Sequence, residues 1–407
     1  FVFLFLLSIS TFLFSFINQI DISGGGSSSD IRTHWKYMGL LNSNLGNLFT
    51  VGKDFKLMNF PLHHIIFSRS DFLSNELSNY LQFFFVFSFI LPILFYLNLK
   101  RLFPKVDNLK ILFYSFLIIL LPNFQASAIW GNNHITAIIF LLLSTLLLNS
   151  TNQESLRSKL NIFLVFFFLA LASYTRQYYV IFFPFFIFKI LKDNKKDIFY
   201  VFLILLILAL PGISYLILNP KLLIFNIGLK ITNFYSSILI TLSIIGFFLI
   251  PFFIMDLKEN LNKLKNFYKN NYLNLILIFF LFIMISLNFK YDGFVGGGFF
   301  HKLSQFIFDN NLFFFALSFL SFLIIFSYKT DRYLFLILNV PIIMSFSSGF
   351  WIFQKYFEPL IIIIFFLLYD KKIVAKIFDK NLIIPSTYFS LYWFVYYFYS
   401  KGFLTIN

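Results

Sequence analysis

The sequence contains no cysteine and few charged residues. Without a thiol, the chain has no disulfide framework, no cysteine nucleophile and no thiolate metal site. Only 12% of the 407 residues are charged, whereas about a quarter of a typical soluble domain is charged. The sequence also shows no internal repeat, no Walker phosphate-binding motif and no soluble domain between its apolar segments. These absences exclude thiol chemistry and argue against a soluble globular protein.

The residues that are present are strongly apolar. Hydrophobic residues make up 59% of the chain, and the mean hydropathy is +0.83. They occur in runs such as IFYVFLILLILALPGISYLIL (198–218), and a run of about twenty apolar residues can cross a bilayer as a helix. We therefore expect a single all-α, polytopic integral membrane domain over residues 1–407. The runs predict about thirteen spans, which begin near Phe1, Tyr80, Ile111, Ile135, Ile162, Tyr178, Ile198, Ser237, Leu273, Leu312, Tyr333, Phe357 and Leu382.

The net charge of +15 predicts the orientation of the chain in the membrane rather than nucleic-acid binding. Of the 32 Lys and Arg residues, 20 fall in one alternating set of loops, and basic residues gather in cytoplasmic loops. This pattern predicts a cytoplasmic N-terminus and a first loop in the lumen or periplasm. All five His residues and both triple-Gly runs (24–26 and 296–298) then lie on the non-cytoplasmic side. We expect the chemistry of the protein on that side.

The first loop, residues 21–79, is by far the longest, and loops of this length tend to be functional or disordered. Its stretches HWKYMGLL and FPLHHIIF are amphipathic and suit the membrane interface. Asp30 has His34 one helical turn further on, and a carboxylate at the membrane face can act as a general base. Alternatively, Asp30 caps a helix that begins at Ile31. The two roles do not exclude each other.

Arg176 and Gln177, in SYTRQYYV, are predicted at the outer mouth of a span. A charge at the bilayer centre costs roughly 2.5–3.5 kcal/mol, so such a residue lies at a span end or faces a cavity. A fixed guanidinium there suits a phosphate, which it can bind through two hydrogen bonds. The alternative is an anchor that reaches the lipid headgroups.

Further outer segments carry polar residues that could face a substrate. His301 and Lys302 follow the second glycine run and could offer positive charge to an anion, although a merely flexible loop is the alternative. Lys355 lies beside Tyr356 near a span end, where Lys and aromatic residues are also routine membrane anchors. A third outer loop offers Trp130, Asn132 and His134. The His residues lack the spacing of zinc ligands, so we expect no metal and no cofactor.

Taken in order, these segments resemble the GT-C superfamily of membrane glycosyltransferases, and most closely the dolichyl-phosphate-glucose-dependent alpha-1,2-glucosyltransferases. The matching motifs are SDIRTHW, NFPLHHIIF, YTRQYYV, GGGFFHKLSQFIF and QKYFEP. The chain departs from the family at several places. Lys355 replaces an Arg and the following Pro is one residue closer, Gly297 replaces an Asp, and the Asn132–Asn133 region replaces an acidic residue. The second His and the Pro-Gln pair that the family has after His301 are missing.

The resemblance implies a GT-C-like fold and a polyprenyl- or dolichyl-phosphate sugar donor. The acceptor would be a lipid-linked glycan, and membrane lipids are the other expected partners. It implies an inverting, metal-independent transfer with Asp30 as base and His34 beside it. Arg176, His301, Lys302 and Lys355 would bind the donor phosphate, whereas Gln177, Trp130, Asn132, His134 and Tyr356 would contact substrate. The membrane would be the endoplasmic reticulum in a eukaryote or the inner or plasma membrane in a bacterium.

Two other functions are compatible with the sequence. A lipid-glycan flippase or small-molecule transporter would typically carry inverted repeats and ionisable groups near the membrane midplane. Here the charges lie at span ends and no repeat is seen, which favours the enzyme. A non-catalytic membrane scaffold would tolerate substitution throughout the long outer loop.

Overall fold

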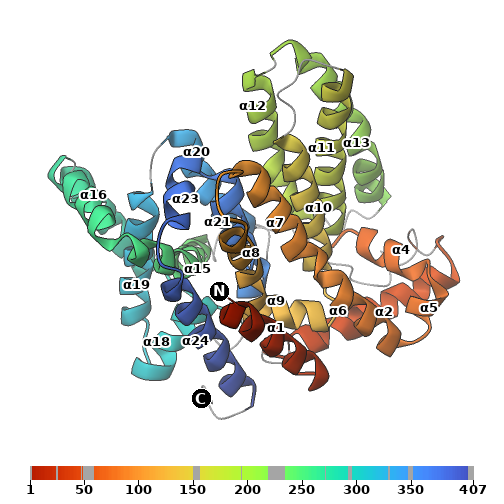
Figure 1. The fold of residues 1–407 in the computed structure, drawn as a ribbon, viewed down its shortest axis with the longest axis horizontal. Helices are drawn as coiled ribbons and strands as arrows, with labels where there is room; N and C mark the ends of the chain where they lie inside the picture. Colours follow the sequence, from red (N-terminus) through yellow and green to blue (C-terminus); the bar gives the residue numbers. More distant parts are fainter. Residues whose placement is uncertain are drawn as a thin grey trace. The chain divides into compact units, whose positions relative to one another are not determined.

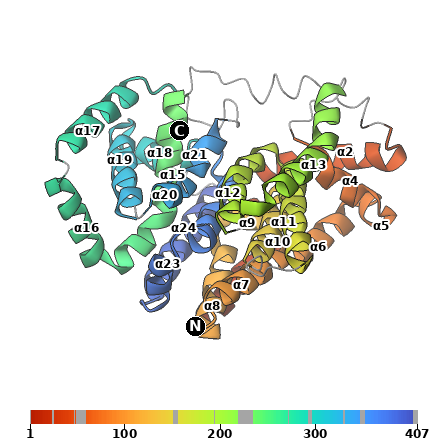
Figure 2. The ribbon, with the colours of Figure 1, turned by 90° about the horizontal axis from the view of Figure 1, so that it is seen from above.

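The computed structural model describes residues 2–23, 26–46, 48, 59–149, 156–193, 195–218, 234–270, 272–291, 296–328, 331–346 and 352–401. Within these ranges every secondary-structure element is a helix, which confirms the all-α class (Figures 1 and 2). Local sequence explains several helix starts. Asp107, Asp331 and Asp370 each accept a hydrogen bond from the backbone N–H two residues further on, and so cap the helices that follow.

The chain divides into two compact units, Phe1–Ile227 and Gly228–Asn407. The described helices of the first unit are α1 (Val2–Ile17), α2 (Gly26–Ser43), α4 (Leu62–Ser68), α5 (Asp71–Ser74), α6 (Leu77–Ser88), α7 (Ile90–Leu102), α8 (Asn108–Phe116), η1 (Leu117–Leu120), α9 (Pro122–Ile129), α10 (Asn133–Leu148), α11 (Leu156–Thr175), η2 (Gln177–Phe182), α12 (Phe183–Asp193), η3 (Lys195–Asp197) and α13 (Ile198–Leu218).

The described helices of the second unit follow the same pattern of long apolar helices and short connecting turns. They are α15 (Phe234–Met255), α16 (Leu257–Asn270), α17 (Tyr272–Leu287), α18 (Gly298–Phe308), α19 (Leu312–Ser327), α20 (Arg332–Leu338), α21 (Val340–Ser345), η5 (Gln354–Tyr356), α22 (Leu360–Ile363), the π-helical η6 (Ile364–Leu368), α23 (Lys371–Phe378) and α24 (Ile383–Ser400).

Polar side chains join the central helices of the first unit. The amide of Asn98 on α7 donates to the carbonyls of Leu94 and Leu142 and accepts a hydrogen bond from Thr145 on α10. Ser144 on α10 donates to the carbonyl of Val165 on α11 at 2.8 Å. Hydrogen bonds of this kind stabilise the association of membrane helices, because the hydrophobic effect does not favour contact between two helices in lipid. They hold α10 between α7 and α11, and α10 carries the candidate site at its start.

The second unit is built around α15. This helix is apolar on every side and 78% of its most apolar window is buried, since α18, α19, α21 and α24 pack around it. Gly246 allows the closest of these contacts. A Cβ at this position would lie 2.0 Å from Oγ and 2.7 Å from the backbone Cα of Ser321 on α19.

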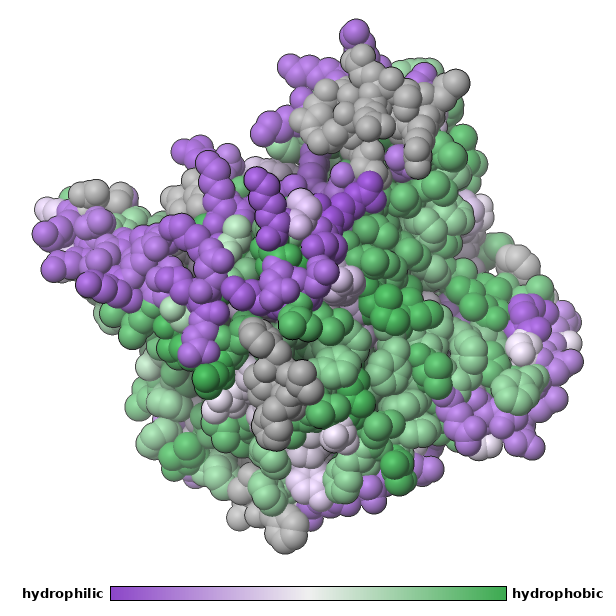
Figure 3. Space-filling view, in the orientation of Figure 1, coloured by the Kyte–Doolittle hydropathy of each residue, from purple (hydrophilic) through white to green (hydrophobic). Residues whose placement is uncertain are grey.

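Several described helices are long and apolar enough to cross a membrane. They are Leu77–Leu102, Lys195–Leu218 and Phe234–Met255, and the number rises from three to five if each of two bent helix pairs forms one span. The apolar window of the candidate span that includes α13 is only 11% buried, so most of its apolar surface is exposed. Figure 3 shows broad hydrophobic surfaces of this kind, with hydrophilic residues gathered over α16. These features fit a membrane protein, and the count of about thirteen spans stays a prediction.

Breaks within the apolar segments explain why fewer long spans are seen than runs were counted. Pro122 begins α9, which leaves the α8–η1 segment at an angle of 72°. Pro341 stands at the start of α21, directly after α20 ends. Proline lacks a backbone N–H and clashes with the preceding turn, so it can divide an apolar run into shorter helices, as it does at these two positions. Helices α13 and α15, in contrast, continue through Pro211 and Pro251.

Candidate functional site

The polar segment after α1 forms the N-terminal part of α2. Asp21 accepts hydrogen bonds from the backbone N–H groups of Ser23, at 3.0 Å, and Ser28, at 2.6 Å, and so satisfies the start of this helix. Asp30 lies inside α2 rather than before it. The alternative that Asp30 caps a helix beginning at Ile31 is therefore wrong, because the helix already starts at Gly26. Asp21 accepts from the N–H of Ser28, and the hydroxyl of Ser23 accepts from the N–H of Ser27.

Asp30 and His34 share one face of α2, since residues four apart lie one above the other on a helix. Asp30 is half-buried, whereas His34 is buried. Nδ1 of His34 lies 2.8 Å from Nε2 of His64, which belongs to α4. This contact ties the face of α2 that bears Asp30 to the interior of the first unit.

His63 has a defined protonation state. Its Nε2 lies 3.0 Å from the hydroxyl of Tyr80, and that hydroxyl donates its hydrogen to the carbonyl of Gly131 at 2.7 Å. Nε2 of His63 must therefore donate, and Nδ1 accepts from the hydroxyl of Thr136 at 3.0 Å. Burial, and then the charges of His64, His34 and Arg176, hold the pKa of His63 well below its ordinary value. His63 is thus a neutral link between α4, α6 and the first turn of α10.

Arg176 reaches the same turn of α10 from the end of α11. Its Nε donates to Oδ1 of Asn133, and its Nη2 donates to Nε2 of His134, both at 2.8 Å. Because Nε2 of His134 accepts, this imidazole is neutral and carries its proton on Nδ1. Arg176 is only 5% exposed, so a permanent positive charge is held inside the first unit at the N-terminus of a helix.

Four residues present buried polar atoms without a hydrogen-bond partner among the described residues. These atoms are both side-chain amide atoms of Asn132, Nδ2 of Asn133, Nε1 of Trp130 and Nδ1 of His64. Asn132 is fully buried and stands at the N-cap of α10, but its side chain makes no capping bond. Such atoms are costly to leave unpaired, so their presence beside a buried charge indicates a polar ligand.

We refer to these residues together as the α10 cluster. It consists of His34, His63, His64, Tyr80, Trp130, Asn132, Asn133, His134, Thr136 and Arg176. It can provide a fixed positive charge, neutral imidazole groups and amide groups in a poorly hydrated place. Within the described residues, no group of three or more His, Cys, Asp or Glu side chains could hold a metal ion.

The second glycine run belongs to a tight corner of the second unit. Gly296, Gly297 and Gly298 all have positive φ, and a Cβ on Gly296 would lie 2.7 Å from the carbonyl oxygen of Ile352. The N–H of Gly297 donates to that carbonyl at 2.9 Å, and the N–H of Phe299 donates to Oε1 of Gln354 at 2.7 Å. Only glycine permits this approach of two backbones.

Behind this corner lies a hydrogen-bonded chain of buried side chains. Nε2 of Gln354 donates to the hydroxyl of Tyr392 at 2.6 Å, and that hydroxyl donates to Oε2 of Glu358 at 2.8 Å. Glu358 is 2% exposed. An ionisable residue buried in an apolar protein is a functional candidate in its own right.

The remaining predicted residues lie in the second unit. His301 is buried against the rings of Tyr291, Phe289 and Phe314, and burial, followed by the charge of Lys302, lowers its pKa to about 4. Burial also lowers the pKa of Lys302, whose Nζ lies 5.4 Å from the ring centre of Tyr399. Lys355 is buried, with its Nζ 5.1 Å from the ring centre of Phe353, and Tyr356 beside it is half-buried.

The structure thus brings one set of predicted residues together. His34, Asn132, His134 and Arg176 belong to the α10 cluster, with Trp130 at its edge and Gln177 half-buried directly after Arg176. His301, Lys302, Lys355 and Tyr356 belong to the second unit. Of the two triple-glycine runs, Gly24 and Gly25 of the first lie outside the described residues.

Several members of these sites were not predicted from the sequence. They are His63, His64, Tyr80, Asn133 and Thr136 in the first unit and Glu358 in the second. One signal was available for Glu358, because an acidic residue directly before the apolar run LIIIIFFLL is unusual in a chain with so few charges.

No protein-family model, curated protein or solved structure matches this chain. The resemblance to GT-C glycosyltransferases therefore rests on the short sequence motifs alone.

Proposed function

We propose that this protein is a membrane glycosyltransferase that moves a hexose, glucose by the resemblance, from a polyprenyl- or dolichyl-phosphate donor to a lipid-linked glycan. In this proposal the transfer takes place on the non-cytoplasmic side, with inversion at the anomeric carbon and without a metal. Asp30 is the general base, His34 supports it, and the α10 cluster receives the donor.

The observation that carries the proposal is the buried Arg176 at the start of α10. A helix N-terminus and a guanidinium both favour a phosphate. In a poorly hydrated site their stabilisation of developing negative charge is large. Asn132, Trp130 and His64 add polar atoms that have no partner among the described residues and suit the hydroxyl groups of a sugar.

The proposed reaction needs no reagent beyond donor and acceptor. Asp30 takes the proton of an acceptor hydroxyl, the hydroxyl oxygen bonds to the anomeric carbon, and the bond from that carbon to the phosphate oxygen breaks. The lipid phosphate leaves with the electron pair, and Arg176 compensates its charge. A phosphate is already a good leaving group, so a general acid is dispensable.

The proposed site lies in the first unit alone. The resemblance assigns Lys302 and Lys355 to the donor phosphate and Tyr356 to the substrate, but all three belong to the second unit and are not members of the α10 cluster. His301 belongs to the second unit as well, and with a pKa of about 4 it is neutral near pH 7 rather than a cation.

The test is a transfer assay in membranes with a radiolabelled polyprenyl-phosphate hexose. Asp30→Asn should abolish transfer of label while leaving donor binding intact, because it removes the base and keeps the shape. The matched control is Asp71→Asn, which changes an exposed carboxylate of the same outer loop and should leave transfer unchanged. Full turnover by Asp30→Asn would remove Asp30 from the mechanism.

The same assay separates the enzyme from its main rival. Label that moves to another lipid or to a protein supports a transferase. Label that only changes sides of the membrane supports a lipid-glycan flippase and contradicts the proposal. Arg176→Lys should weaken donor binding, since an ammonium group lacks the planar guanidinium fork that binds a phosphate through two hydrogen bonds while it also contacts Asn133 and His134.

A further inference from the structure

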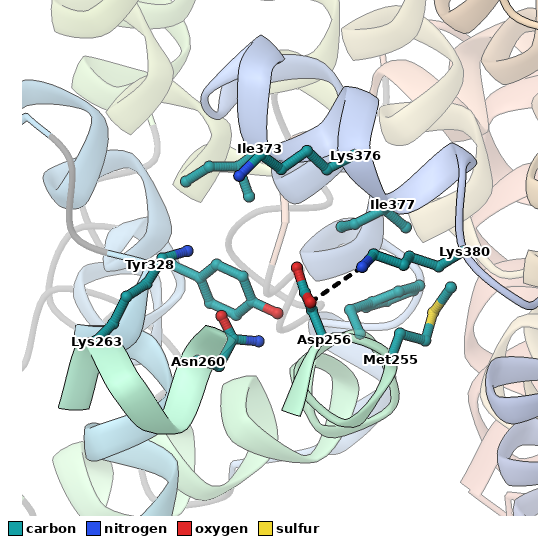
Figure 4. Close-up of a pocket in the computed structure, with 10 residues that line it drawn as sticks. Met255, Asp256, Asn260, Lys263, Tyr328, Ile373, Lys376, Ile377 and Lys380 are labelled. Carbon is teal, nitrogen blue, oxygen red and sulfur yellow. Dashed lines mark hydrogen bonds and ion pairs between the residues drawn. The ribbon is translucent and has the colours of Figure 1, made fainter. Parts of the chain in front are cut away.

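A small recess that is open to solvent lies in the second unit, and none of its lining residues belongs to the glycine corner. The end of α15, the start of α16, the end of α19 and helix α23 surround it (Figure 4). Its polar lining consists of Asp256, Asn260, Lys263, Tyr328, Lys376 and Lys380. We call it the α16–α23 recess.

The recess has a positive charge balance. Lys263, Lys376 and Lys380 line it, against the single carboxylate of Asp256. Lys380 pairs with Asp256 at 3.0 Å, and Figure 4 shows the two side chains meeting across the recess. Glu259, outside the lining, pairs with Lys263 at 2.9 Å and with Lys376 at 3.1 Å. Three cations therefore share two anions.

The ion pairs at the recess are weak enough to rearrange. The side chains of Lys376 and Glu259 are 59% and 38% exposed, and exposed pairs contribute little to stability. An incoming anion can draw the lysine amino groups away from Glu259 at small cost. A phosphate is a stronger partner for several ammonium groups than one shared carboxylate is.

The hydroxyl of Tyr328 gives a second, independent sign of a ligand. Tyr328 is 2% exposed, and its hydroxyl has no hydrogen-bond partner among the described residues. In Figure 4 this hydroxyl points into the recess, towards Asp256 and Asn260. A buried hydroxyl without a partner is costly, so a group with an acceptor oxygen would stabilise it.

The surroundings favour an amphiphilic ligand over a free ion. The base of the recess is apolar, since Phe252, Met255 and Ile377 also line it. Ile254, Leu257 and Leu261 beside it expose between 42% and 49% of their surface. Helices α16 and α23 are amphipathic and rich in lysine, and α16 meets the apolar α17 at 98°. A helix of this kind, turned across the direction of a span, suits the membrane interface.

We propose that the α16–α23 recess binds the headgroup phosphate of an anionic phospholipid. The phosphate contacts Lys263, Lys376 and Lys380 and accepts a hydrogen bond from Tyr328, and an acyl chain follows the apolar residues at the end of α15. Both helices belong to the loops that the Lys and Arg pattern predicts to be cytoplasmic. The recess is therefore separate from the proposed reaction, and it anchors the second unit to the lipid.

The test uses the full chain in phosphatidylcholine nanodiscs at about 0.15 M salt, where charges more than about 8 Å apart are screened. Three separate samples receive phosphatidylglycerol, extra phosphatidylcholine or inorganic phosphate. The amount of bound lipid and the apparent Tm of the protein are measured in each sample. Phosphatidylglycerol should bind and raise the Tm, whereas the other two should not. Equal protection by inorganic phosphate would overturn the lipid assignment, and no effect of phosphatidylglycerol would overturn the site.

A matched pair of double variants tests the location. Lys376→Gln with Lys380→Gln should weaken phosphatidylglycerol binding roughly tenfold or more, since each lysine near a headgroup contributes a several-fold factor. Lys371→Gln with Lys372→Gln makes the same charge change on exposed residues of α23 that do not line the recess. This control should bind nearly as the wild type does. If both double variants lost the same phosphatidylglycerol affinity, the lipid would be attracted by the general positive charge of α23, and the assignment of the binding site to the recess would be wrong.

Tyr328→Phe provides a test that does not depend on charge. Without anionic lipid this variant should be as stable as the wild type or more stable, because it removes a buried hydroxyl that has no partner among the described residues. With phosphatidylglycerol its gain in Tm should be smaller than that of the wild type. A gain equal to that of the wild type would remove Tyr328 from the site and leave the proposal without its second observation.

Discussion

Gly131→Ala should damage the α10 cluster, because residue 131 lies directly against Tyr80. Gly131 has a φ of +61°, a conformation that residues with a Cβ rarely adopt. A Cβ here would lie 2.3 Å from Cε1 of Tyr80 and 2.8 Å from its Cζ. Tyr80 has no room to retreat, because it is fully buried and packs against Phe67, Phe84 and His63.

The expected loss of stability combines two costs. The left-handed conformation costs a residue with a Cβ about 1–2 kcal/mol, and overpacking of a buried contact costs about 1–3 kcal/mol. The sum is roughly 2–5 kcal/mol. For a unit of this length, each kcal/mol lowers the Tm by about 2–4 °C, so the expected loss is roughly 4–20 °C. The displaced ring would also give up its hydrogen bond with His63, so transfer activity should fall as well.

The measurement is thermal unfolding of the purified protein in detergent, followed by gel filtration of the heated samples. Gly39→Ala is the matched control. Gly39 lies within α2, no atom stands within 4 Å of the place that an added methyl group would take, and alanine is the better helix former by about 1 kcal/mol. The control should therefore be as stable as the wild type or slightly more so. If Gly131→Ala unfolds at the temperature of the wild type, the packing of Tyr80 against residue 131 is wrong.

Three further predictions concern the packing and pH response of the helices. Gly246→Ala should destabilise the second unit by about 1–3 kcal/mol, because the added methyl group clashes with Ser321. The double variant Gly246→Ala with Ser321→Gly should recover part of the lost Tm. An unchanged Tm of the single variant would refute the close contact between α15 and α19. Asn98→Leu removes three buried hydrogen bonds of about 0.6 kcal/mol each and should lower the Tm. The control Asn288→Leu changes an exposed asparagine and should leave the Tm unchanged. Equal effects of the two substitutions would contradict the hydrogen-bonded link between α7 and α10. In the folded protein the pKa of His301 is about 4, whereas in the unfolded chain it is about 6.5. The contribution of neutral His301 to the free energy of unfolding is therefore fully present above pH 6.5 and is lost as the pH falls towards 4. The loss is at most about 1.4 kcal/mol per pH unit. His301→Phe should flatten that part of the profile of Tm against pH, and an identical slope in the variant would argue against a buried neutral His301.

The sequence predicted local features better than the contacts between distant segments. Helical periodicity was sufficient to place Asp30 and His34 on one face, and the apolar runs were sufficient to predict the all-α class. The capping alternative for Asp30 failed because the Ser-rich stretch before it is itself helical, with Asp21 as the residue that satisfies its start. Asp21 lies seven positions before Ser28, whose N–H it binds, whereas an ordinary N-cap residue lies two or three positions before the N–H that it binds. The usual capping pattern therefore could not identify Asp21 from the sequence.

The histidine pair shows why half of the α10 cluster was missed. His63 and His64 are adjacent, which is a poor spacing for one shared ligand. On a helix, however, neighbouring side chains point in different directions. His64 reaches α2, whereas His63 reaches Tyr80 and Thr136. These partners are separated from His63 by 17 and 73 positions, so only the folded arrangement reveals them.

The contrast between α13 and α15 has a consequence for how the two helices tolerate sequence change. Each is a long apolar helix with an internal proline, yet only 11% of the apolar window that includes α13 is enclosed, against 78% for α15. Most side chains of α15 pack against a neighbouring helix, so a substitution there changes the fit between two helices. Most side chains of α13 face away from the rest of the first unit, so a substitution there that keeps the helix apolar leaves the packing of the unit unchanged.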